Sequence, residues 1–192
     1  MAIYDIEDLS SLDLPWWNLA SIRQIDAILA GKPGARVFEW GSGASTLWLA
    51  RRAAAVTSIE HDALWYTEMQ ARTKALPHID LRLVTPDAPD KYDARYRSER
   101  LGWRGRSFAG YVREIERTEG LYDLVVIDGR ARTACLEAAL PRLAPGGYIV
   151  FDNSARKRYS RRIATSHLVT RTFRGLTACL PYVDETMLLS HE

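Results

Sequence analysis

Apolar and polar positions divide the chain into a regular series of expected strands and helices. Apolar residues recur at helical spacing from Asn18 to Leu29, and the glycine-rich stretch 31–34 ends this helix. Short apolar runs predict strands at 36–40, 55–60, 79–84, 122–128 and 148–151. Helices are expected between and after them at 47–52, 62–76, 108–117, 133–143 and 155–167.

Strands that alternate with helices favour a parallel sheet covered by helices on both faces. The last two expected strands, 169–173 and 185–189, have no helix between them, which predicts an antiparallel hairpin at one edge. We therefore expect an α/β fold with a doubly wound, mostly parallel, seven-stranded sheet. One domain is expected over 35–192, with a long basic loop at 86–106, preceded at 1–34 by an arm and a lid helix.

The composition is that of a globular protein, with 47% hydrophobic and 26% charged residues. No apolar run approaches the ~20 residues of a membrane span, and the acidic N-terminus lacks an apolar signal segment, so we expect a cytoplasmic protein without membrane contact. Cys135 and Cys179 form no metal or redox motif, and we interpret both as reduced packing residues. The net charge of +2 does not by itself indicate nucleic acid.

The stretch from Val37 to Thr46 joins an apolar strand to a helix through Gly41-Ser42-Gly43. Glycines let a backbone approach a ligand closely, and a helix start offers free N–H groups. Such a turn is typical of nucleotide-like ligand sites but also of ordinary loops. An NAD site would favour a third glycine at position 46, where Thr46 stands.

Acidic residues stand at the ends of four expected strands. They are Glu39, Glu60, Asp128 and Asp152, the last followed by Asn153. In open α/β sheets, ligands bind outside the carboxyl ends of the strands. These acids are therefore expected to gather around one ligand site.

Four motifs, in this order and spacing, resemble the class I S-adenosylmethionine-dependent methyltransferases. They are Glu39-Trp40-Gly41-Ser42-Gly43, Ile59-Glu60-His61-Asp62, Tyr122 to Gly129 and Leu143 to Val150. The resemblance covers residues 35–190 and implies a Rossmann-like fold with one extra antiparallel strand, methyltransferase activity and S-adenosylmethionine as cofactor. The family often has a third glycine at position 45, where Ser45 is small enough for the turn to persist.

The resemblance assigns the glycine turn to the methionine part of the cofactor. Gly41 and Gly43 would let the backbone lie against it, and Glu39 would face its amino group or anchor the turn. The same turn contributes Ser42, Ser45 and Thr46 to the expected cofactor site.

The nucleoside part of the cofactor would meet the second motif. Glu60 would accept both ribose hydroxyls, because a carboxylate accepts bidentate hydrogen bonds; the alternative is a solvated acid at a strand end. His61 would flank the adenine or stand exposed in the turn.

Asp128 is expected close to the transferred methyl group, both as a cofactor contact and as the catalytic residue. Methyl transfer is an in-line displacement at carbon, so the enzyme mainly positions the acceptor and can remove its proton. Asp128 would be that base.

Asp128, Asp152 and Asn153 also resemble the set with which catechol and caffeoyl-CoA type O-methyltransferases hold a divalent cation. Hard oxygen ligands suit Mg²⁺, which would lower the pKa of a bound hydroxyl. Two arguments oppose the metal. Asp and Asn often cap a following helix, and Arg130 and Arg132 would compete for the same carboxylates.

The acceptor side is expected at Trp16, Trp17, Arg130 and Asn153. The two tryptophans could stack on a flat acceptor or cover the cofactor, or they could pack the first helix onto the sheet. Arginines interleaved with aromatic residues at 91–106, and a second basic cluster at 156–162, suit phosphates and stacked rings, as in nucleotides or single-stranded RNA. The alternative is a solvated basic surface.

The sequence thus predicts O-methylation of a small acceptor, anionic or phosphorylated in view of the arginines. Rival hypotheses are an RNA or nucleotide methyltransferase, a module that binds the cofactor without turnover, and a transferase that moves an aminopropyl group. The basic loops argue against the last, because a polyamine acceptor would favour acids. The oligomeric state stays open, and a homodimer is compatible with the sequence.

Overall fold

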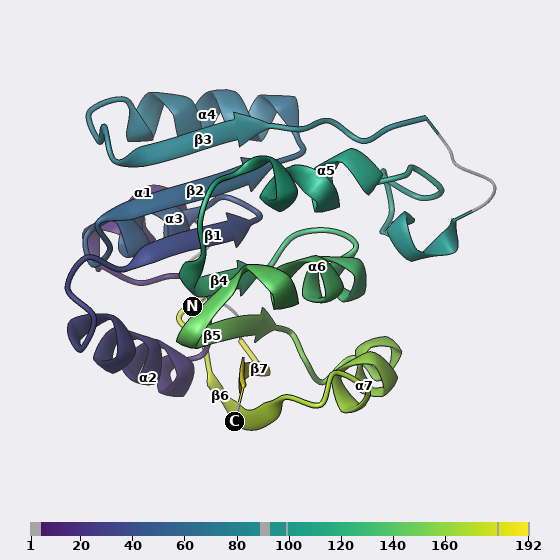
Figure 1. The fold of residues 1–192 in the computed structure, drawn as a ribbon. Helices are drawn as coiled ribbons and strands as arrows, with labels where there is room; N and C mark the ends of the chain where they lie inside the picture. Colours follow the sequence, from purple (N-terminus) through teal and green to yellow (C-terminus); the bar gives the residue numbers. More distant parts are fainter. Residues whose placement is uncertain (1–4, 89–92, 99, 180, 192) are drawn as a thin grey trace.

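The computed structural model describes residues 5–88, 93–98, 100–179 and 181–191. Within them one sheet contains β1 (Arg36–Trp40), β2 (Ala55–Glu60), β3 (Ile79–Leu83), β4 (Tyr122–Ile127), β5 (Leu143–Asp152), β6 (Val169–Leu176) and β7 (Val183–Ser190). The strand order is β3-β2-β1-β4-β5-β7-β6. Strands β1 to β5 run parallel, whereas β7 is antiparallel to β5 and β6. The predicted doubly wound, seven-stranded sheet with its closing hairpin is confirmed (Figure 1).

Helices cover both faces of the sheet. They are α1 (Ile6–Ser11), α2 (Leu19–Ala30), α3 (Ala44–Ala50), α4 (Ala63–Thr73), α5 (Ala109–Arg113), α6 (Arg132–Ala139) and α7 (Lys157–Ala164), with 3-10 turns at Ala94–Tyr96, Glu114–Arg117 and Leu140–Arg142. Helices α2 and α3 pack on the face that holds Val37 and Leu124, and α5, α6 and α7 pack on the face that holds Phe38 and Val125. Because side chains alternate along a strand, Glu39 shares the face of Val37 and is directed toward α3.

Helix α2 belongs to one of these layers, which corrects the expected lid helix. Its apolar residues Ile22, Ile25 and Leu29 are buried against the sheet. Its N-cap, Asn18, accepts a hydrogen bond from the Ser21 N–H and donates to Thr186 Oγ1 in β7. The helix is therefore fixed to the sheet and to the closing hairpin, and it does not cover the ligand edge.

The structure of the N-terminal arm and the start of β5 differ from the sequence-based expectation. The arm at 1–14 contains a short helix, α1, which begins at the N-cap Asp5 and packs against α3. The stretch Pro145 to Gly147, which precedes the strand expected at 148–151, lies inside β5, where the pairing with β4 shifts register and Gly146 adopts φ +66°. Such a bulge is tolerated because glycine reaches positive φ without strain.

The parallel strands end on one edge of the molecule, where the connections after β1, β2, β4 and β5 gather (Figure 1). The segment after β3 lies over this edge, with Ala94–Tyr96 in a 3-10 turn; positions 89–92 and 99 of the expected basic loop are outside the described residues. In the described part of the chain, no helix combines the length and the apolar character that crossing a bilayer would need.

Candidate functional site

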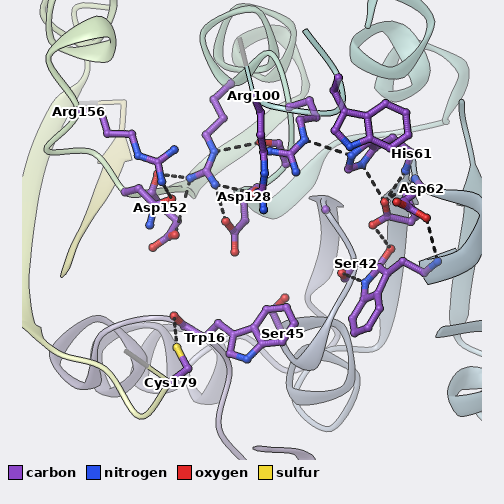
Figure 2. A pocket seen from close by; sticks show the side chains of 18 of the residues that line it. Trp16, Ser42, Ser45, His61, Asp62, Arg100, Asp128, Asp152, Arg156 and Cys179 are labelled. Atoms are coloured by element: carbon purple, nitrogen blue, oxygen red, sulfur yellow. Dashed lines mark hydrogen bonds and ion pairs between the residues drawn. The ribbon is translucent and has the colours of Figure 1, made fainter. Parts of the chain in front are cut away.

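A cavity of about 930 Å³ opens at the carboxyl ends of β1, β2, β4 and β5. The structure brings most of the predicted site residues to its wall: Trp16, Gly41, Ser42, Ser45, Glu60, His61, Asp128, Arg130, Asp152 and Asn153. Figure 2 shows Asp128 and Asp152 on one wall, with Trp16 and Cys179 across from them and His61 and Asp62 at one end. Four predicted residues, Glu39, Gly43, Thr46 and Trp17, are not among the lining residues.

The turn after β1 requires glycine at position 41. Gly41 has φ +98°, and a Cβ there would lie 2.9 Å from the backbone nitrogen of Gly129. The turn therefore fits closely against the connection that follows β4. This contact joins the two halves of the cavity wall, because Asp128 directly precedes Gly129.

Glu39 is bonded to the helix that follows this turn and to the neighbouring strand β2. Its carboxylate accepts hydrogen bonds from the hydroxyls of Ser45 (2.6 Å), Thr46 (2.5 Å) and Ser58 (2.6 Å), and it is fully buried. Thr46 Oγ1 also accepts the Gly43 N–H at 2.9 Å. Burial raises the pKa of Glu39 to about 7, against the opposing effect of the three hydroxyls. Glu39 and Thr46 thus hold α3 to the sheet behind the cavity wall.

The two tryptophans have different surroundings. The Trp16 ring covers Gly43, whose Cβ position lies 3.1 Å from that ring, and it stacks on Trp65 with centroids 6.0 Å apart. Gly43 therefore makes room for Trp16, and its contact with the cofactor stays a prediction. Trp17 is fully buried against Trp48 in the core, so the expectation that it meets the acceptor is wrong.

Glu60 is fixed at the end of β2 with one oxygen occupied. Oε1 accepts the backbone N–H groups of His61 (2.7 Å) and Asp62 (2.8 Å). Among the described residues, Oε2 has only the Ser42 hydroxyl, at 3.4 Å. The second oxygen therefore keeps accepting capacity on the cavity wall. Glu60 is 2% exposed, which excludes the alternative of a solvated acid.

His61 is buried rather than exposed in its turn. Its ring meets Trp103 and Phe108 edge-on at 5.0 and 5.5 Å. Arg130 Nε donates to His61 Nε2 at 3.1 Å, so Nε2 is the acceptor in this contact. Nδ1 lies 2.8 Å from Glu60 Oε1 but is not aligned for a hydrogen bond. The ring thus forms a fixed flat surface beside Glu60.

A buried arginine lies between the acids that were expected to hold a metal. Arg132, the first residue of α6, donates from Nη2 to Asp128 Oδ1 at 2.7 Å, and its Nη1 lies 3.7 Å from Asp152 Oδ2. It also donates to the backbone oxygens of Gly129 and Asp152. Burial and the charge of Asp128 raise the pKa of Asp152 well above its usual range. The Arg132 guanidinium thus contacts the carboxyl groups of both Asp128 and Asp152.

The structure does not support the predicted Mg²⁺ site. The Arg132 guanidinium fills the position between Asp128 and Asp152, and Asn153 is directed to Asp184, to which its Nδ2 donates at 2.6 Å. Asp152 Oδ1 accepts from Thr186 Oγ1 at 2.8 Å. Among the residues with described positions, no cluster of three His, Cys, Asp or Glu side chains has the geometry to hold a metal ion. One oxygen of Asp128 and one of Asp152 thus accept hydrogen bonds from Arg132 and Thr186.

Sequence reasoning missed several residues that line the cavity. Arg100 and Trp103 reach it from the segment after β3, Arg156 from the N-cap of α7, and Cys179 and Tyr182 from the connection between β6 and β7. The spacing of Asp128 and Arg132, four residues apart at a helix start, was the one sequence signal for their pairing. The hairpin residues gave no signal, because only the strand order brings them to this edge.

Comparison with known proteins gives one family and one fold. Residues 38–154 match a family model described as a methyltransferase domain. The fold is similar to that of an O-methyltransferase from Bacillus cereus in complex with S-adenosylhomocysteine, with a TM-score of 0.67 and 17% identity over 97% of this chain and 90% of that one. An rRNA methylase from Streptococcus thermophilus has a TM-score of 0.58 and 11% identity, over 89% of this chain and 96% of that one. A methyltransferase-like protein from Silicibacter pomeroyi has a TM-score of 0.51 and 24% identity, over 86% of this chain and 84% of that one. No curated protein sequence matches the chain.

Proposed function

The chain belongs to the methyltransferase domain family, and from this premise we propose that it transfers a methyl group from S-adenosylmethionine to an oxygen of a small anionic acceptor. The observation that carries this proposal is one continuous cavity that runs from Gly41 and Glu60 to Asp128 and Arg156. A cavity of this kind has room for a donor at one end and an acceptor at the other.

The residues near the β1 and β2 ends fit the donor. Glu60 Oε2 has accepting capacity for the ribose hydroxyls, and His61 and Trp103 offer ring edges and faces for the adenine. Ser42 and Ser45 line the same part of the cavity, behind which Gly41 fixes the turn. S-adenosylmethionine, when bound, supplies an activated methyl group on a sulfonium.

Asp128 is the proposed proton acceptor at the other end. Its Oδ1 is held by Arg132, so the carboxylate is fixed in position at the cavity wall, and the other oxygen would take the proton. A positioned carboxylate can take the proton of an attacking hydroxyl as the oxygen–carbon bond forms. No step requires a metal, because Arg132 already supplies a positive charge beside the reacting oxygen.

The acceptor is proposed to be anionic because arginines surround its half of the cavity. Arg100, Arg130 and Arg156 line the cavity together with Asp128. Guanidinium groups bind carboxylates and phosphates by charge-assisted hydrogen bonds. The same arginines favour a second candidate, methylation of RNA, for which affinity would fall steeply with salt.

Transfer of a labelled methyl group tests the proposal. The purified chain is incubated with methyl-labelled S-adenosylmethionine and a panel of hydroxylated acids, phosphate esters and RNA. We expect product from a small anion and loss of at least tenfold in rate for Asp128→Asn, the scale of a positioned base. Transfer to RNA alone would replace the small acceptor with the second candidate, and cofactor binding without transfer to any acceptor would indicate a non-catalytic module.

A further inference from the structure

A second cavity, of about 180 Å³, adjoins the acceptor half of the first. The two share Arg100, Gly129, Arg130, Arg132 and Arg156 in their walls. Arginines from the segment after β3, from the start of α6 and from the start of α7 meet there, and none of the described lining residues is acidic. We call this space the arginine cavity, and its volume is well above the ~10–15 Å³ that one water needs.

The charge in the arginine cavity is only partly balanced. Arg132 pairs with Asp128, and Arg95 pairs with Asp93 at 2.7 Å. For Arg130 and Arg156, no carboxylate among the described residues lies within ion-pair distance: Arg130 donates to His61 and Arg156 to Asn153 Oδ1. Burial lowers the pKa of Arg130, and the positive charge of Arg100 lowers it further. Cations thus repel one another at the junction of the two cavities.

The first turn of α6 adds to this positive potential. Ala131, its N-cap, has φ +47° and no side chain that could cap the free N–H groups of the turn. Ala131, Arg132 and Thr133 line the arginine cavity. Helix N-termini favour anions, so this feature acts in the same direction as the arginines.

We propose that the arginine cavity binds a phosphate group of the acceptor. This inference rests on the proposed function, and it narrows the acceptor to a small phosphate ester whose hydroxyl reaches Asp128 while its phosphate lies between Arg100, Arg130 and Arg156. A doubly charged phosphate neutralises more of these cations than a carboxylate does, and its oxygens accept bidentate arginine contacts. The site is compact and joins the methyl-transfer end directly, which favours a small molecule over an extended nucleic acid.

Calorimetric titration with inorganic phosphate tests the proposal, with S-adenosylhomocysteine titrated separately. We expect one phosphate per chain, no comparable binding of acetate, and an affinity for phosphate that falls roughly tenfold or more in Arg100→Gln and in Arg156→Gln. Arg23→Gln is the matched control, because Arg23 is exposed on α2 at the opposite face of the sheet. Its phosphate affinity should equal that of the unmodified chain.

The two titrations separate the possible failures. Each variant must still bind S-adenosylhomocysteine, which shows that it is folded. If the unmodified chain binds S-adenosylhomocysteine but not phosphate, or if the Arg100 and Arg156 variants bind phosphate as before, the phosphate site is overturned and the proposed function stands. Equal binding of acetate, or tighter binding of single-stranded RNA with a steep salt dependence, also overturns it. Failure of S-adenosylhomocysteine to bind would overturn the proposed function instead.

Discussion

The guanidinium of Arg132 donates a hydrogen bond of 2.7 Å to the carboxylate of Asp128, inside the wall of the large cavity. The same side chain lies 3.7 Å from Asp152, so one guanidinium contacts two acids at the ends of neighbouring strands. The contact with Arg132 fixes the orientation of the Asp128 carboxylate.

Removal of this cation should strongly destabilise the fold. Arg132→Ala leaves Asp128 unpaired beside the buried Asp152, and breaking a buried ion pair costs about 3–5 kcal/mol. Arg132→Lys should lose less, because an ammonium keeps the charge but not the planar fork of donors. Urea denaturation measures both, with Arg161→Ala, at an exposed position of α7, as a control that should change the unfolding free energy by less than about 0.5 kcal/mol. An Arg132→Ala variant as stable as that control would contradict the pairing.

Activity should not depend on a divalent cation. Initial rates of methyl transfer should be equal with EDTA, without additions and with Mg²⁺, since Arg132 occupies the position between Asp128 and Asp152. Loss of activity in EDTA that returns with Mg²⁺ would show that a metal binds here after all.

A methyl group at Gly41 should disrupt the joined turns. Gly41→Ala combines positive φ with a contact of 2.9 Å to the Gly129 nitrogen. Gly34→Ala is the matched control, because Gly34 has φ +88° but nothing within 4 Å of its Cβ position. We expect Gly41→Ala to lose at least 1–3 kcal/mol more unfolding free energy than Gly34→Ala, about the cost of overpacking. Equal losses in the two variants would mean that the turns are not in contact.

Stability should fall with rising pH because of Glu39. Its pKa is raised to about 7 in the folded state from 4.5, so between these values the folded chain keeps a proton that the unfolded chain releases. The contribution of this proton to the unfolding free energy is fully present below about pH 4.5. It is lost as the pH rises through 7, a change of roughly 3 kcal/mol. In Glu39→Gln this part of the decline should be absent, whereas Glu119→Gln, at an exposed position, should keep it. Identical pH profiles for Glu39→Gln and the unmodified chain would refute the raised pKa.

The strand ends could be predicted from sequence because their signals are local. Apolar runs such as Leu124 to Ile127 mark buried strands, and a glycine turn or an acid marks where each one ends. Parallel strands end at one edge of the sheet, so the sequence pattern predicts that Glu60, Asp128 and Asp152 share a site. All three line the large cavity.

Side-chain partners could not be predicted, because they depend on packing. The alternation along β1 directs Glu39 toward the hydroxyls of α3, away from the cavity. Trp16 and Trp17 are adjacent in sequence, yet one lines the cavity and the other is in the core. Arg132 was expected only as a competitor of the metal, and its place between two acids follows from how α6 docks beside β4 and β5.

Binding of S-adenosylhomocysteine to the unmodified chain and to Glu60→Gln tests the central claim most directly. Calorimetry should give one molecule per chain, with binding weaker by roughly 1–3 kcal/mol in Glu60→Gln, the scale of hydrogen bonds to a charged group. Glu68→Gln, at the half-exposed ion pair with Arg72 on α4, should bind as the unmodified chain does. Absence of binding to the unmodified chain would contradict the assignment of this cavity to the methyl donor.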